Sequence, residues 1–534
     1  MQNAGFRSAL ISLPMPSILI DIFNDVLGPV MRGPSSSHCA AALRIGRIAR
    51  ELVDGELSEV VVAFDRAGSL PTTHASHGSD LGLCGGLLGW AADDDRLPGS
   101  VGALREAGIR LRFETADFGD PHPNTYRLRL RNAREEHTLI AVSTGGGAIE
   151  VIDVDGMPIR MDGGWHETLV WLPEATPCPL EGDEVVVHDA REGVVVQVKG
   201  AAFVPDEALA PLRPARVRRT APVLPVASRR GVRVPFTTCA EMRAFDRGRA
   251  TPVWELAVLY ERARGGMDER EVLDRAIGLA RILRRSMAQG CAGTSRDDRV
   301  LGCQSRGFDA NMRAGALLDA GALNRIVLYV TAMMEVKSAM GVIVAMPTAG
   351  ACAALPGAVI GMAETMGLGE GAMARAFLAA GLIGVFVASA WSFAAEAGGC
   401  QAECGVASAM AATGLVTLAG GTRDQAVAAA SMALQNVLGL VCDPVANRVE
   451  VPCLGRNVMA AANALACANM ALSAFDPVIP LDEVIDAAKR IAKQMPRELR
   501  CTGLGGLSTS PTSQHIEARL AGGVGRRTLY AGRR

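Results

Sequence analysis

The hydrophobic and polar positions divide the chain into two parts of different type. Before about residue 205, short runs alternate apolar and polar side chains, as in 126–130, where Tyr126, Leu128 and Leu130 are separated by arginines. From residue 238 onward, apolar residues instead recur at intervals of three and four, as in the segment 272–287. The first pattern is typical of half-exposed strands and the second of amphipathic helices. We therefore predict an α+β fold, with an N-terminal α/β domain followed by an all-α domain.

The boundary between the two parts is a segment rich in proline and arginine. We assign residues 1–205 to the first domain, 206–237 to a linker, 238–520 to the helical domain and 521–534 to a tail. A basic run can bind nucleic acid, but so many prolines favour an extended, solvated linker. A formal net charge of −2 also argues against nucleic acid or an acidic membrane surface as the main partner.

Composition indicates the size of the core and the cellular compartment. With 534 residues, of which 49% are hydrophobic, the chain can bury a large core. The 13 cysteines are odd in number and scattered, which favours a reducing compartment, so we expect a cytoplasmic protein. The uncharged run 376–395 is long enough to span a membrane. It leads directly into a cysteine-containing loop and has no comparable second run, so we interpret it as a buried central helix.

Three cysteines in the second half lie at breaks in regular structure. Cys400 follows two glycines, Cys442 precedes an Asp-Pro pair, and Cys453 follows a proline. Thiolates at such breaks can point into a cavity, and they select zinc, copper(I) or iron–sulfur clusters. Three thiolates would leave one corner of a cubane cluster open for a substrate. The spacing alone matches no compact ferredoxin pattern.

Polar motifs in the first half are candidates for the remaining chemistry. The sequence GPSSSH places Ser35, Ser36, Ser37 and His38 before the helical stripe 41–52, where serines cap a helix or its free N–H groups bind an anion. A loop after the predicted strand 58–64 contains His74 and His77. His122 and Asn124 precede the strand at 126–130. A histidine in a loop is more often structural than catalytic, so these residues need a second argument.

That argument is a resemblance to a known family. The segments EAGGCQAECGVASAMAA, GLVCDPVANRVEVPCLGRN and MPRELRCTGLGGLSTSPT resemble the alpha domain of the iron–sulfur-dependent bacterial L-serine dehydratases. The motifs GPSSSH, HGSD and HPNT resemble the family's beta domain, and the order beta then alpha agrees with its fused members. Some members end in a cysteine that reaches the cluster, whereas this chain ends in Arg534.

The resemblance implies a set of site residues. It makes Cys400, Cys442 and Cys453 the ligands of a [4Fe–4S] cluster, and it makes Cys404 a packing residue because the family usually has an apolar residue there. It gives His77 an active-site role, which we interpret as that of the α-proton base, with His122 in reserve. The expected substrate-binding residues are Ser35, Ser36, Ser37, His38, Asn124, Thr348, Arg456 and Asn457.

The implied reaction is the conversion of L-serine to pyruvate and ammonia. Loss of hydroxide from the β-carbon needs a Lewis acid for the leaving oxygen and a base for the α-proton. We expect a small amino acid as the partner, a homodimer, and no binding to nucleic acid or membrane. An iron–sulfur lyase acting on L-threonine, on L-cysteine as a desulfidase, or on a different hydroxy acid is the alternative. A membrane or scaffold protein with incidental cysteines is the third interpretation.

Overall fold

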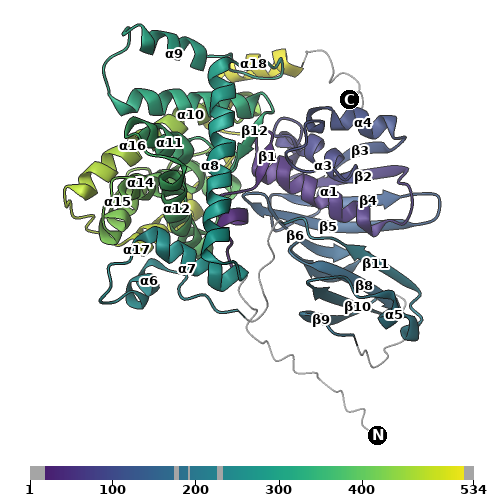
Figure 1. Cartoon of the computed structure of the whole chain (residues 1–534). Coiled ribbons are helices and arrows are strands. Elements are labelled where there is room, and N and C mark those ends of the chain that lie inside the picture. The colour runs from purple at the N-terminus through teal and green to yellow at the C-terminus, as the bar shows by residue number, and fades with distance from the viewer. Residues whose placement is uncertain (1–18, 174–179, 191–192, 225–231, 522–534) are drawn as a thin grey trace.

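The computed structural model describes residues 19–173, 180–190, 193–224 and 232–521. Strands and a few helices form the N-terminal part, and helices form the C-terminal part, so the predicted α+β fold is confirmed (Figure 1). The two parts lie side by side, with the long helix α8 (Glu269–Ala292) running along the helical part (Figure 1).

The N-terminal part is built around a six-stranded sheet with the order β3-β2-β4-β5-β6-β7. Strands β2 and β3 are parallel, and the other neighbours are antiparallel. One hydrophobic core joins α1 and α3 to a face of this sheet. The elements are β2 (Glu59–Asp65), β3 (Arg110–Ala116), β4 (Thr125–Arg131), β5 (Glu136–Gly145), β6 (Ala148–Val154), β7 (Met157–Met161), α1 (Ala41–Leu52), α2 (Leu70–Thr73), α3 (Ser79–Leu87) and α4 (Ser100–Glu106).

A second, four-stranded antiparallel sheet has the order β11-β8-β10-β9. Its strands are β8 (His166–Leu172), β9 (Glu184–Asp189), β10 (Val194–Gly200) and β11 (Arg216–Thr220), and α5 (Asp206–Leu209) lies beside them. Strand β11 falls inside the predicted linker, so the expectation of a solvated segment is wrong for these residues. Arg216 stacks on Trp171 at 3.9 Å, and β-pairing with β8 supplies the hydrogen bonds that a free linker would lack.

Helices α1 and α3 pack with their backbones in contact. A Cβ atom on Gly86 would lie 2.0 Å from the carbonyl oxygen of Leu43, and one on Gly82 would lie 2.0 Å from that of Cys39. Only glycine allows so close an approach without moving a backbone. This contact fixes the start of α3, and His77 lies two residues before that helix.

The C-terminal part is a helical body around one large hydrophobic core. Its elements are α6 (Cys239–Phe245), α7 (Val253–Gly265), α9 (Ser305–Arg313), α10 (Ala322–Ser338), β12 (Val342–Val344), α11 (Ala354–Thr365), α12 (Glu370–Ala390), α13 (Ala395–Gly398), α14 (Val406–Leu418), α15 (Arg423–Gln435), α16 (Cys453–Leu472), α17 (Leu481–Gln494) and α18 (Pro511–Ala521). Among the described residues, α12 is the one helix long and apolar enough to cross a membrane, and 78% of its apolar window is buried inside the protein. This burial is what the interpretation as a central core helix predicts.

The start of the described chain belongs to the helical core. Ile22 and Val26, in a short helical turn, lie against Gly381 and Gly384 of α12, where any side chain would collide with them. Strand β1 (Val30–Arg32) then pairs with β12 in an antiparallel ladder. The sequence analysis assigns these residues to the first domain, but in the structure they pack in the core of the helical part. The hydrophobic side chains of residues 1–205 are therefore divided between that core and the core beside the six-stranded sheet. The boundaries near residues 205 and 237 stay predictions.

The glycine contact between α1 and α3 can be tested by substitution. We expect Gly86→Ala to destabilise the protein by about 1–3 kcal/mol, because the added methyl group must displace the Leu43 backbone. Gly102→Ala in α4 is the matched control, since no atom lies within 4 Å of the place that its methyl group would take and alanine favours helix by about 0.5–1 kcal/mol. Thermal unfolding of both variants checks this. An unchanged midpoint for Gly86→Ala would contradict the close packing.

Candidate active site

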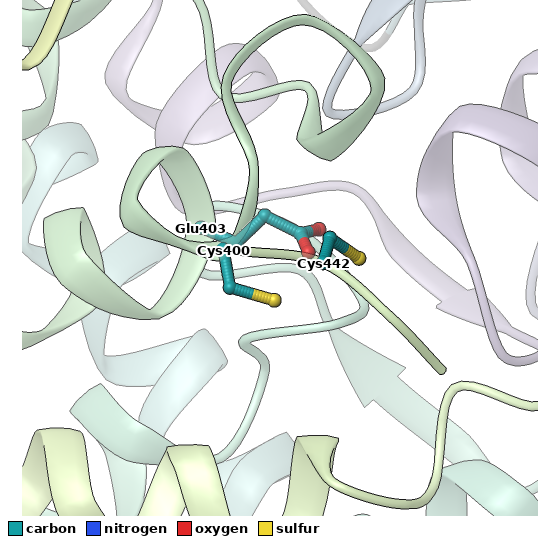
Figure 2. Close-up of side chains that lie close together, drawn as sticks. All are labelled: Cys400, Glu403 and Cys442. Atoms are coloured by element: carbon teal, nitrogen blue, oxygen red, sulfur yellow. The ribbon is translucent and has the colours of Figure 1, made fainter. Parts of the chain in front are cut away.

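Buried thiols from separate segments of the helical part gather in one place. The Sγ atoms of Cys400 and Cys442 and a carboxylate oxygen of Glu403 all lie within 4.8 Å of one another (Figure 2). Cys400 lies between α13 and α14, Cys442 follows α15, and Cys453 is the first residue of α16. Cys453 is buried at the start of that helix, and burial, and next the negative charge of Cys400, raise the pKa of its thiol.

Cys400 is the thiol best prepared to be a thiolate. Hydrogen bonds from the Cys404 and Cys442 thiols, and then the charge of Arg456, hold the pKa of Cys400 well below its usual value against the effect of burial. The Nη1 atom of Arg456 lies 3.4 Å from Cys400 Sγ, and its Nη2 atom donates to Asp443 at 2.7 Å. A set of buried soft ligands next to a fixed positive charge fits an anionic metal–thiolate centre, so this group can hold a metal.

Two further thiols complete the group. Cys404 packs among alanines, as a packing residue would, but its thiol also contacts Cys400. The backbone N–H of Cys501 donates to the carbonyl of Cys442 at 2.9 Å, and the two thiols are hydrogen-bonded. Sequence reasoning missed Cys501, although it lies in the third segment quoted for the resemblance. Cys501 lies close to Cys442 because the loop after α17 folds back onto that residue.

His77 comes from the N-terminal part and reaches the loop between two of these cysteines. It is 1% exposed, and among the described residues the backbone of Asn447 is the one group within hydrogen-bonding reach of its ring nitrogens. Burial, and next the electrostatic effects of His38 and Arg448, lower the pKa of His77 well below its usual value. It also lies against the backbone of Asn447, which is between Cys442 and Cys453. His77 is therefore a buried neutral imidazole against the loop that joins Cys442 and Cys453.

His38 packs edge-on against His77, with ring centroids 4.7 Å apart. Burial lowers the pKa of His38 to about 3, so it is also neutral. Its Nδ1 atom lies 3.0 Å from Ser35 Oγ, and its Nε2 atom lies 2.9 Å from Thr73 Oγ1. These bonds fix the ring of His38 and leave it with no free nitrogen.

The serines of GPSSSH dock onto the helical part. Ser36 Oγ accepts a hydrogen bond from the backbone of Ala349 at 3.1 Å, and Ser37 is buried. No side-chain bond caps the start of this helical turn, so the alternative of simple capping is wrong here. The neighbouring Thr348 donates to Glu403 at 2.6 Å. The motif thus joins the two parts of the chain beside the thiols.

Asn124 and His122 lie in different environments. Asn124 is buried, its Oδ1 atom accepts from Ser69, and its amide lies against the carboxylate of Glu396. The Nδ1 atom of the half-buried His122 accepts from the backbone of Asn124 at 3.1 Å, so His122 orders the turn before β4. His74, expected to be background, pairs with Asp80 at 2.6 Å.

Asn457 holds the start of α11. Its Oδ1 atom accepts from the backbones of Ala353 and Ala354 at 3.2 and 3.0 Å, and its Nδ2 atom donates to Gly350 at 2.8 Å. Its amide is engaged within the protein, and its substrate-binding role stays a prediction.

Three charged residues of the site were not predicted. Glu396 is buried, and burial raises the pKa of its carboxyl group. Burial and the neighbouring Cys400 raise the pKa of Glu403 to about 8. Lys337 is fully buried and donates to the carbonyl of Val449, in the loop between Cys442 and Cys453. The two glutamates flank Cys400 in the motif EAGGCQAE, and this closeness in sequence to a predicted ligand could have identified them as site residues. Nothing in the sequence around Lys337 indicates that it lies near the site.

Comparison with known proteins identifies related sequences for both parts of the chain. The family model described as "Serine dehydratase alpha chain" matches residues 248–508. The "Probable L-serine dehydratase, alpha chain" of Bacillus subtilis is 41% identical over 46% of this chain and 81% of the relative. The corresponding "beta chain" of that organism is 38% identical over 27% of this chain and 66% of the relative. "L-serine dehydratase 1" of Escherichia coli is 27% identical over 89% of this chain and 96% of the relative.

The matches to separate alpha and beta chains account for both parts of the polypeptide, and the long match accounts for their joining. The chain belongs to the L-serine dehydratase family.

Proposed function

We propose that this protein is a lyase that converts L-serine to pyruvate and ammonia, with a [4Fe–4S] cluster bound by Cys400, Cys442 and Cys453. The observation that carries the proposal is the position of His77, a buried neutral imidazole with a free ring nitrogen, against the loop that joins two of the thiols. A cytoplasmic location and a homodimer stay predictions.

The three thiolates would hold the cluster, which when bound supplies an open iron as a Lewis acid for the leaving hydroxyl group. Arg456 offsets the charge of the Cys400 thiolate and is itself held by Asp443. Lys337, through its bond to Val449, ties the loop between Cys442 and Cys453 to α10. These contacts keep the thiols of three segments together.

His77 is the residue that we assign to the α-proton. A neutral imidazole has one nitrogen lone pair available, and no residue in the described part of the protein occupies it. The ring of His38, which is fixed by its own hydrogen bonds, packs against one side of the His77 ring and restricts its orientation. Removal of the α-proton and loss of the β-hydroxyl give aminoacrylate, which adds water and releases pyruvate and ammonia without further help from the protein.

The proposed function is tested by an anaerobic assay on protein reconstituted with iron and sulfide. Pyruvate should form from L-serine with a much higher kcat/KM than any product from L-threonine or L-cysteine. Preference for L-cysteine with release of sulfide would instead identify a desulfidase, and no turnover of any of the three would contradict the proposal.

The ligand assignment predicts the iron content of cysteine variants. Cys400→Ser, Cys442→Ser and Cys453→Ser should each lose bound iron and activity, because a serine oxygen is a poor substitute for a soft thiolate. Cys404→Ser should keep most of both. Cys467→Ser is the matched control, because its buried thiol lies 3.4 Å from Asn436 Nδ2, a contact that a hydroxyl can replace. Iron and sulfide retained in Cys442→Ser would contradict the assignment.

The role of His77 predicts a kinetic effect without loss of the metal. His77→Ala should lower kcat by about 10²–10⁴-fold, the usual cost of losing a general base. Iron content and thermal stability should stay near those of the wild type. His515→Ala, an exposed histidine in α18, is the control. If His77→Ala with a full complement of iron kept a near-normal kcat, the α-proton base would be His122 or another residue.

The lowered pKa of His77 also predicts the pH dependence. A lowered pKa keeps the imidazole neutral at pH 7, and the base form is lost only as the pH falls through that lowered value. The acid limb of kcat/KM should therefore lie below about pH 6.5, the ordinary value for histidine. Initial rates with L-serine across this range measure it, and an acid limb at or above the ordinary value would argue against His77.

A further inference from the structure

We propose that Glu396 binds the ammonium group of the amino acid substrate. This inference rests on the proposed function, since it assigns the recognition of one end of the substrate in the same site. Glu396 lies in α13, four residues before Cys400, and has His38 and Asn124 of the N-terminal part as neighbours. It is 7% exposed, and its Oε2 atom has no hydrogen-bond partner among the described residues.

A buried amino acid must keep its ammonium group paired with oxygen acceptors, at least one of them anionic, because an unpaired buried charge is costly. The other buried carboxylates near the thiols are already engaged. Asp443 accepts from Arg456 through Oδ1 at 2.7 Å and from the backbone of Leu507 through Oδ2 at 2.8 Å. Neither oxygen of Asp443 is left for a ligand.

Glu450 and Glu403 are also committed. Both oxygens of Glu450 accept from the backbones of Val300 and Leu301, at 3.1 and 2.9 Å. Glu403 accepts from Thr348 through Oε1 and lies against the sulfur atoms of Cys400 and Cys442, on the metal side of the site. Glu396 is therefore the carboxylate around the thiols with an unused oxygen.

The surroundings of Glu396 contain no competing cation. No lysine or arginine forms an ion pair with it in the described parts of the chain, and its nearest basic neighbour is His38, with Nδ1 3.5 Å from Oε1. That nitrogen is already engaged with Ser35, and the ring is neutral. A substrate ammonium group would supply both the missing positive charge and the missing donor.

The position of Glu396 relative to His77 fits the chemistry of an α-amino acid. The α-carbon carries both the ammonium group and the proton that the base removes, so the two protein groups must lie close to each other. His38 contacts both of them, at 4.7 Å between ring centroids to His77 and at 3.5 Å to Glu396. Asn124, which directly precedes β4, directs its amide to the carboxylate of Glu396 and so helps to hold it in place.

The alternative is that Glu396 only orients His38. The two roles are separated by comparing L-serine with 3-hydroxypropionate, which has the same carboxylate and hydroxyl group but no ammonium group. In Glu396→Gln we expect KM for L-serine to rise by at least about 10-fold, as for loss of a hydrogen bond to a charged group. The inhibition constant of 3-hydroxypropionate should change by less than about 2-fold, because that ligand makes no use of the charge.

Two variants complete the experiment on anaerobically loaded enzyme with measured iron content. Glu396→Asp keeps the charge and should recover part of the L-serine affinity. Glu167→Gln, a buried glutamate of β8 that also has an unpartnered oxygen, is the matched control and should leave both constants unchanged. Equal weakening of both ligands in Glu396→Gln, or a fall in kcat alone, would overturn the inference. Turnover of L-serine by the wild type tests the proposed function separately.

Discussion

The site depends on the anchoring of the N-terminal segment in the helical core. Arg264 forms ion pairs with Asp21 and Glu261, each at 2.8 Å, and the backbone of Ile22 donates to Glu261 at the same distance. All three side chains are buried, so removing one partner would leave an uncompensated charge inside the protein. The geometry of this network, together with the β1–β12 ladder, sets the register in which the N-terminal part meets the helices.

That register brings polar side chains into the buried interface between the two parts of the chain, where some of their atoms form no hydrogen bond with the described residues. A ring nitrogen of His77 and the Oε2 atom of Glu396 have no hydrogen bond of standard geometry among the described residues. Unpartnered buried polar groups cost free energy and persist where the surrounding structure holds them in place. They come from both parts of the chain and share His38 as a neighbour. A substrate with an ammonium group, a hydroxyl group and an acidic α-proton could engage them.

The sequence predicts individual helices and strands better than it predicts the tertiary contacts between them. Alternation at Tyr126, Leu128 and Leu130 correctly indicates β4, and the three-and-four spacing correctly indicates α8. The breaks at Cys400 and Cys442, with the resemblance, predict two thiols that the structure places together. Strand β11 is missed because its stability comes from pairing with β8, which no local pattern encodes.

The residues that sequence reasoning missed share a physical cause. Glu396, Lys337 and Cys501 owe their positions to contacts between segments far apart in the chain, such as the return of the loop after α17 to Cys442. The packing of Ile22–Val26 in the helical core has the same origin, since a pattern read in chain order assigns those residues to the first domain. The resemblance predicts His77 as a site residue, but only the three-dimensional arrangement shows that it is buried against the loop that joins Cys442 and Cys453.

In the proposed mechanism the substrate binds between His77 and a metal held by the three thiols. Mössbauer spectroscopy of the ⁵⁷Fe-loaded enzyme, recorded anaerobically with and without L-serine, tests this arrangement. We expect a minority of the iron, the part without a protein thiolate, to change its isomer shift and quadrupole splitting when L-serine is added. Spectra that are identical in the two states, with all iron in one thiolate-bound environment, would contradict it.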